Sequence, residues 1–196
     1  MNTRERLIEG ARELLWERGY VGMSPKAIQR KAEAGQGSMY HHFSGKTELA
    51  EVALRRSAET LRGQTEKQLS AGGSALERIA AYLLRDRDVL RGCPIGRLAQ
   101  DPEVIADPRL RRPLNETFSW LRDRLAEIVR QGVAQGEFSP ELDAADTAAA
   151  MVAVLQGGYV LARASGSAEP FASAVRGAVA LLSARATKST TPGHRS

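Results

Sequence analysis

The amino-acid sequence predicts an all-α protein with about nine helices. In nearly every segment, apolar residues recur at the three- to four-residue spacing of an amphipathic helix. Capping residues followed by proline mark helix starts, and glycines mark helix ends. No segment alternates apolar and polar residues in the way a half-buried strand does, and no internal repeat is visible. These patterns together favour a fold built only from helices.

The first helix is expected over Thr3–Arg18, where Gly19 follows as a typical terminator. Ser24 and Pro25 then form a strong start signal, a hydroxyl cap before a proline, for a short helix at 25–32. A second short helix is expected at 36–42. Two short helices separated by a tight turn are typical of a helix-turn-helix.

Longer helices are expected in the rest of the chain. Asp107-Pro108 repeats the start signal, and the segment Leu142–Arg163 is apolar nearly all round, so it should be buried on more than one side. We expect a helix-turn-helix domain at 1–46, a helical domain at 47–186 and a disordered tail at 187–196. The predicted helices of the second domain are 46–69, 74–90, 94–100, 107–135, 142–163 and 169–186.

The composition excludes several classes of protein. With 42% hydrophobic and 26% charged residues among 196, the chain is ordinary globular material rather than a disordered polyelectrolyte. One cysteine and three histidines cannot build a disulfide framework, and they are too few and too scattered for a metal site, so we expect no metal and no cofactor. No paired carboxylates, nucleophile with a base, or phosphate loop indicates an enzyme.

Nothing in the sequence predicts a membrane protein. No apolar run reaches the roughly 20 residues of a membrane helix, because the best stretch, 148–161, contains Gln156 and two glycines. The N-terminus opens directly into an amphipathic pattern without a signal peptide. We therefore expect a soluble, cytoplasmic protein with no membrane partner.

The positive charge is concentrated near the N-terminus. The net charge is +5 overall, and the segment from Arg18 to Lys46 contains five basic residues and one acidic residue, Glu33. By contrast, residues 63–184 carry 14 basic and 15 acidic side chains. The alternative is a solvated surface with a chance excess of base, but the pattern favours an N-terminal head that meets a polyanion.

The segment Ser38–Lys46, with the sequence SMYHHFSGK, resembles the DNA-binding domain of the TetR family of bacterial transcriptional regulators. The resemblance covers the first fifty residues or so, including the Lys46–Leu49 start of the next helix. Together with the later Gly92–Gly96, it is nearest to the LmrA/YxaF-like branch of that family. One departure lies in the turn, where Glu33-Ala34-Gly35 replaces the usual Gly-Val-Ser, so Glu33 is expected to take the positive φ that usually selects glycine.

On the short helix 36–42, Met39 and Phe43 are expected to face inward while the other side contacts DNA. Small polar groups suit base edges, Tyr40 and His41 can donate to phosphates, and Lys46 starts a helix whose free N–H groups favour a phosphate. The alternative makes Tyr40 and His42 partly core residues and Lys46 merely solvated. The expected DNA-contacting residues are Ser24, Lys26, Gln36, Gly37, Ser38, Tyr40, His41 and Lys46.

The C-terminal part is expected to bind a partner copy and a ligand. The resemblance implies a homodimer closed by a four-helix bundle of 142–163 and 169–186, where Ala149, Ala153, Gly157 and Gly158 would permit close packing. An apolar cavity is also expected, although an aromatic at helical spacing is more often core. The expected pocket residues are Tyr82, Cys93, Phe118, Trp120, Met151 and Tyr159.

The sequence thus predicts a TetR-like repressor that binds a palindromic operator in double-stranded DNA and is released by a small apolar or amphipathic effector. Two alternatives stay open at this point. One is a thiol- or electrophile-responsive regulator acting through Cys93, whose place at a helix start could lower its pKa. The other is a helical ligand-binding protein with no affinity for DNA.

Overall fold

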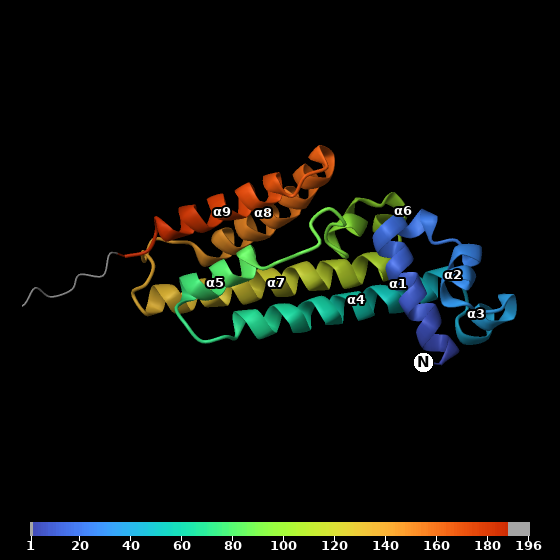
Figure 1. Cartoon of the computed structure of the whole chain (residues 1–196). Helices are drawn as coiled ribbons and strands as arrows, with labels where there is room; N and C mark the ends of the chain where they lie inside the picture. The colour runs from blue at the N-terminus through green and yellow to red at the C-terminus, as the bar shows by residue number, and fades with distance from the viewer. Residues whose placement is uncertain (1, 188–196) are drawn as a thin grey trace, which may run out of the picture.

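The computed structural model describes residues 2–187, which form nine α-helices and one 3₁₀ helix (Figure 1). Within this range the only β-type pairing is an isolated bridge between Phe138 and Ala186. The expectation of an all-α fold with about nine helices is confirmed. The expected disordered tail lies outside the described residues, except for Thr187.

Three helices form a head at one end of the molecule: α1 (Thr3–Gly22), α2 (Pro25–Ala32) and α3 (Gln36–His42) (Figure 1). Helix α1 begins where the Asn2 side chain accepts the N–H of Glu5 at 2.9 Å. Gly19, at φ 72°, interrupts it with a kink, after which a further turn runs to Gly22. The glycine predicted to end the first helix therefore bends it.

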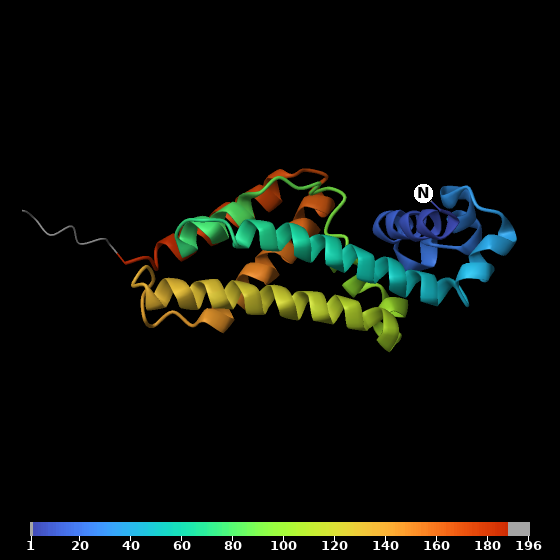
Figure 2. The same ribbon diagram turned by 90° about the horizontal axis from the view of Figure 1, so that it is seen from below.

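Two long helices, α4 (Lys46–Leu69) and α7 (Pro108–Ala134), run side by side along the molecule (Figure 2). Helix α7 starts at the predicted signal, because the Asp107 carboxylate accepts the N–H of Arg109 at 2.9 Å. An Arg124–Glu66 ion pair at 2.9 Å joins the two helices near the end remote from the head. Helix α4 thus connects the head to the body.

Between α4 and α7 the boundaries differ from those predicted. Helix α5 (Ala75–Leu84) ends six residues before the predicted Leu90, where the Arg87 guanidinium donates to the carbonyls of Tyr82 and Leu83. The 3₁₀ helix η1 (Gly96–Gln100) replaces an expected short helix. Helix α6 (Pro102–Ala106) was not predicted, although Asp101-Pro102 is the same start signal as Asp107-Pro108.

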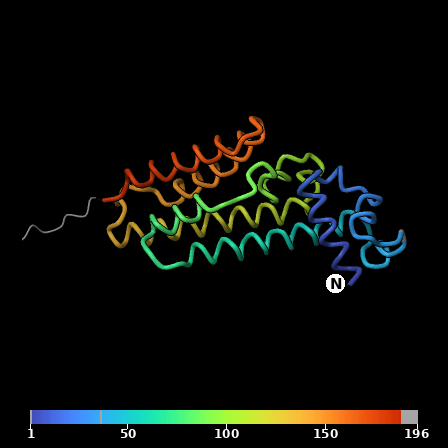
Figure 3. Tube along the Cα trace, in the orientation of Figure 1, coloured from blue at the N-terminus to red at the C-terminus, as the bar shows by residue number. Residues whose placement is uncertain are grey.

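The chain closes with α8 (Ala144–Ser165) and α9 (Glu169–Ser183), which pack against each other beside α7 and α5 (Figure 3). The prediction that α8 is buried on more than one side is only partly met, because Val160 and Leu161 are about half-exposed. Gly158 lets the Phe171 ring approach the α8 backbone, since a Cβ there would lie 2.9 Å from that ring.

The expectation that no segment is long and apolar enough for a membrane helix is wrong for α8. Its 22 residues make it long and apolar enough to span a membrane by length and composition, with a mean hydropathy of 1.3 over the best window. Gln156 and the two glycines interrupt the apolar run, but the mean hydropathy of the window stays within the range of membrane-spanning helices. Helix α8 packs on α7 and α9, but only 28% of the window is buried, so packing within this chain accounts for part of its apolarity.

The hydrophobic core is divided into two clusters. The first joins the head to the start of α4, to η1 and to the start of α7, and it includes Leu98 and Leu110. The second fills the body between α5, α7, α8 and α9. Phe118 and Tyr159 are half-buried and pack against both clusters. These two aromatic residues therefore lie at the seam between head and body.

Candidate DNA-binding surface and ligand cavity

Helix α2 is fixed at both ends by local chemistry. Ser24 caps it by accepting the N–H of Ala27 at 3.2 Å, with Pro25 in the first turn. At the other end Glu33 adopts the left-handed conformation, φ 50° and ψ 45°, as the sequence predicts. A glycine is the usual residue there, so Glu33 holds the turn at some conformational cost while its carboxylate stays exposed.

Helix α3 is anchored on one side and open on the other. Met39 is fully buried and Phe43 is 3% exposed, which confirms the predicted inward face. On the outer side Tyr40 is 58% exposed and His41 is also exposed, and a Cβ added at Gly37 would meet no atom within 4 Å. The short helix therefore presents a polar surface that another molecule can approach closely.

Lys46 is held at the start of α4 rather than merely solvated. Its ammonium lies 3.9 Å from the centroid of the Tyr20 ring. The Tyr20 hydroxyl is 2.8 Å from Oγ1 of Thr47, so the ring itself is tied to the same helix end. The contact between Tyr20 and Lys46 was not predicted, because a ring that positions a lysine from another helix has no local signature.

The predicted DNA-contacting residues lie on α2, α3 and the start of α4, all at the head end of the molecule (Figure 1). Ser24 and Lys26 are exposed at the start of α2, and Ser38 is half-buried. Gln36 is the first residue of α3. His42 is half-buried against Phe43, with ring centroids 6.5 Å apart, so the inward alternative applies to His42 but not to Tyr40. No cluster of metal-ligating side chains occurs within the described chain.

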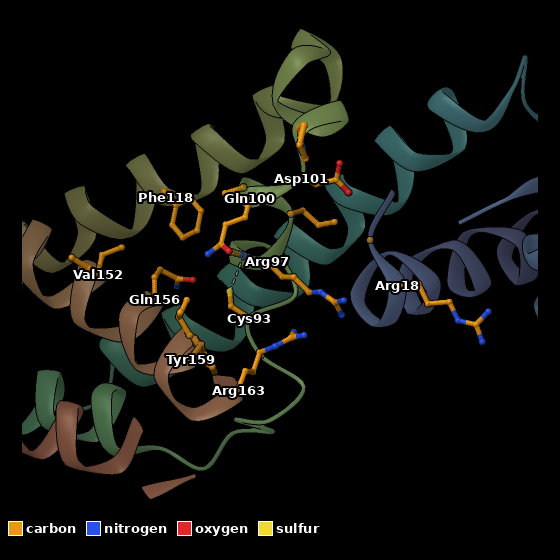
Figure 4. A pocket seen from close by; sticks show the side chains of 18 of the residues that line it. Arg18, Cys93, Arg97, Gln100, Asp101, Phe118, Val152, Gln156, Tyr159 and Arg163 are labelled. Carbon is orange, nitrogen blue, oxygen red and sulfur yellow. Dashed lines mark hydrogen bonds between the residues drawn. The ribbon is translucent and has the colours of Figure 1, made fainter. Parts of the chain in front are cut away.

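A second feature is a cavity of about 830 Å³ between the α1 kink, η1, α7 and α8 (Figure 4). Of the six expected pocket residues, Cys93, Phe118 and Tyr159 line it. The Cys93 thiol is largely buried and accepts the Gly96 N–H at 3.2 Å. A Cβ at Gly96 would collide with the Gln156 amide, so this glycine permits the close approach of η1 and α8.

The other three expected pocket residues do not line this cavity. Tyr82 and Met151 are buried in the body core, where neighbouring helices cover their side chains. Trp120 is half-buried on a different face of α7, with the Arg62 guanidinium 6.0 Å from its ring. The type and spacing of these residues could not show which helix faces meet around this cavity.

The head and the cavity are joined by two polar residues at the ends of η1. The Arg97 guanidinium donates to the carbonyls of Trp16 and Glu17, each at 2.6 Å, just before the kink at Gly19. Asp101 accepts the N–H of Tyr20 at 2.9 Å, just after it. We call Arg97 and Asp101 the η1 clamp; both also line the cavity. Sequence reasoning missed this pair because its partners lie about 80 residues away.

Comparison with known proteins gives consistent family matches at both ends of the chain. Residues 7–53 match the model "Bacterial regulatory proteins, tetR family", and residues 73–178 match "Tetracyclin repressor-like, C-terminal domain". The transcriptional regulator LmrA of Bacillus subtilis is 26% identical over 176 residues, covering 86% of this chain and 90% of its own. The transcriptional repressor KstR2 of Mycolicibacterium smegmatis is 25% identical, covering 72% of this chain and 70% of its own.

Solved structures show the same fold. A TetR transcriptional regulator from Chloroflexus aurantiacus is 27% identical and superimposes with a TM-score of 0.80, covering 94% of this chain and 96% of its own. A regulator from Cytophaga hutchinsonii, at 22% identity and a TM-score of 0.83, covers 95% of this chain and 96% of its own. The similarity therefore extends over head and body together.

Proposed function

The chain belongs to the TetR family of bacterial transcriptional regulators, and on that premise we propose that it is a repressor that binds a palindromic operator as a homodimer and releases it when a small molecule fills the cavity. The protein is a DNA-binding regulator rather than an enzyme. We place its action in the bacterial cytoplasm, where such a regulator meets DNA.

The observation that carries the proposal is the outer face of α3. Met39 and Phe43 hold the helix from the inner side, Gly37 leaves room for base edges, half-buried Ser38 can reach them with its hydroxyl, and Tyr40 and His41 can donate to phosphates. Lys46, kept in place by the Tyr20 ring, adds a positive charge at a helix N-terminus. Ser24, Lys26 and Gln36 complete the proposed contact set.

The proposed dimer explains the unpartnered apolar face of the body. Leu181 is 75% exposed on α9, and Val160 and Leu161 are about half-exposed on α8. Ala149, Ala153 and Gly157 are exposed on α8 and small enough for a second copy to pack closely. A two-fold axis through these helices would place two heads on two half-sites, which is what a palindromic operator requires.

Release of DNA is proposed to follow from where the cavity lies. It touches the α1 kink on the head side and α7 and α8 on the body side. A ligand that prefers a different arrangement of these elements would change the spacing of the two α3 helices, which must match successive major grooves about 34 Å apart. Strong release requires a preference of a few kcal/mol for the non-binding state.

The first test is selection of bound sequences from random duplex DNA with the full chain. An enriched palindrome is expected, and Tyr40→Ala and Lys46→Ala should each weaken binding to it by about tenfold or more. Lys67→Ala is the matched control, because Lys67 is exposed on the same helix α4 but at the far end. If no sequence is enriched at low salt, or if all three variants behave alike, the proposed DNA-binding surface is refuted.

A further inference from the structure

The charges around the cavity have nearly all one sign. Arg18, Arg97, Arg122 and Arg163 are among its lining residues, whereas Asp101 is the acidic one. In the described part of the chain, none of the four arginines has a carboxylate oxygen within 4.0 Å. Four positive charges therefore border the cavity against one negative charge, and among the described residues none of the four is held in a close ion pair.

The Asp101 carboxylate supplies one negative charge at the cavity, but its oxygens accept from backbone N–H groups rather than from an arginine. It accepts from Tyr20 at 2.9 Å and from Glu103 at 3.1 Å, the latter at the start of α6. The Arg163 guanidinium makes a long hydrogen bond, 3.4 Å, to the Arg91 carbonyl. Arg97 and Arg163 lie at the same end of the cavity (Figure 4), and burial together with the nearby positive charge of Arg163 lowers the pKa of Arg97.

The end of the cavity away from Arg97 and Arg163 is lined by apolar side chains. Phe118 and Val152 lie at one end, and Arg97 and Arg163 lie at the other, with Gln156 between them (Figure 4). Tyr159 adds an aromatic face, and burial raises the pKa of its hydroxyl, which therefore stays protonated and can donate a hydrogen bond. Apolar side chains thus gather at one end of the cavity and Arg97 with Arg163 at the other, while Arg122 lies one turn after Phe118 on α7.

We propose that this cavity binds an amphipathic anion, a ring or chain that packs on Phe118, Val152 and Tyr159 and carries a carboxylate or similar group to Arg97 and Arg163. A volume of about 830 Å³ accommodates a molecule of drug-like size. Guanidinium groups suit planar anions, and half-buried Arg97 and exposed Arg163 each lack a carboxylate partner within residues 2–187, so an anionic ligand can pair with both. The inference deepens the proposed function by naming the effector's chemical class.

The same site gives the ligand a route to the head. Arg97 holds the Trp16 and Glu17 carbonyls of α1 while it faces the cavity. An anion bound to Arg97 competes for the guanidinium and loosens one half of the η1 clamp. Since Tyr20, on the other side of the kink, positions Lys46, a shift there reaches the proposed DNA-binding surface.

The test compares two fluorescent dyes on the full-length protein without DNA. Anilinonaphthalene sulfonate is an amphipathic anion, and phenylnaphthylamine is the same ring system without the sulfonate. The wild type should bind the anionic dye about tenfold more tightly than the neutral one, a difference of about 1.4 kcal/mol. Arg163→Gln and Arg97→Gln should remove most of that preference, and Arg111→Gln, at an exposed arginine on α7 outside the cavity, should keep it.

Phe118→Ala is a second test. It should weaken the binding of both dyes equally, which would show that both bind in the cavity. Equal affinity of the wild type for both dyes, or an unchanged preference in Arg163→Gln, would overturn the inference. Circular dichroism of each variant separates lost binding from lost folding, and exposed Arg163 carries the test if Arg97→Gln unfolds. The dye experiment contains no DNA, so it stands or fails separately from operator selection.

Discussion

The head and the body organise their functional residues in opposite ways. In the head, the outer face of α3 and the start of α4 come from one short stretch, and two buried residues, Met39 and Phe43, hold it. In the body, the cavity combines α1, η1, α7 and α8, so that Arg18 and Arg163 border the same space. A surface built from one local segment can be predicted from its spacing, whereas a cavity built from four segments depends on how they pack.

The two regions also differ in how firmly they are packed. Helix α3 rests on fully buried side chains of the head core, while Phe118 and Tyr159 are half-buried and contact both cores at once. A seam of this kind can adjust without opening either core. We therefore expect the head to move as a unit when the cavity is occupied.

Salt should separate the two regions most strongly. Raising it from about 50 to 200 mM should weaken operator binding by about 10³-fold or more, because several phosphate contacts release counterions. Binding of the neutral dye in the cavity should change little over the same range, because this dye makes no ion pair with the protein. Fluorescence titrations of labelled operator and of dye measure both, and parallel losses would contradict the division of roles.

Removing an aromatic ring should cost the head more than the cavity. Phe43→Ala should lower the free energy of unfolding by about 3–5 kcal/mol, because the ring is buried beneath α3. Phe118→Ala should cost clearly less, because that ring is half-buried and borders an existing cavity. Urea denaturation followed by circular dichroism gives both values, and the reverse order would show that the seam, not the head, carries the tighter packing.

A charged residue on the exposed apolar face of α8 and α9 should weaken dimer association and leave the structure of the head unchanged. Leu181→Glu should weaken the proposed dimer by about tenfold to a hundredfold, because burying a leucine contributes roughly 1.5–3 kcal/mol. Leu84→Glu, at a half-exposed leucine on α5, is the control and should leave association unchanged. Analytical ultracentrifugation at several protein concentrations measures the dimer dissociation constant. If Leu181→Glu leaves this constant unchanged, the interface lies elsewhere.

The smallest effect is expected from acid at the junction of α3 and α4. The Ser44 hydroxyl and backbone N–H donate to Oε2 of Glu48 at 2.7 and 2.6 Å, which lowers the pKa of Glu48. The folded state therefore gains stability at pH values above the unfolded pKa of about 4.3, and this gain is lost as the pH falls through the folded pKa.

Glu48→Gln should consequently lose less stability than the wild type between neutral and acidic pH. Thermal unfolding from pH 7 to 3 measures the difference, which should be small because Glu48 is only half-buried and its interactions are local. A steeper acid dependence in the variant would contradict the assigned hydrogen bonds.

Much of the fold followed from local rules. The caps at Ser24 and Asp107, the positive φ of Glu33 and the inward face of α3 were all predicted from neighbouring residues. The early end of α5 was not, because it depends on Arg87 folding back onto carbonyl groups of the preceding turn. Helix α6 is a different case, since its start signal was present and was overlooked.

By itself the sequence determined the helical class, the family and the polar face of α3, because capping, periodicity and short motifs act within a few residues. Only the tertiary structure decided that Tyr82, Trp120 and Met151 lie outside the cavity. It alone also placed four arginines around that cavity and joined Arg97 to the kink in α1. Those features depend on which helix faces meet across the chain, and no local pattern specifies such meetings.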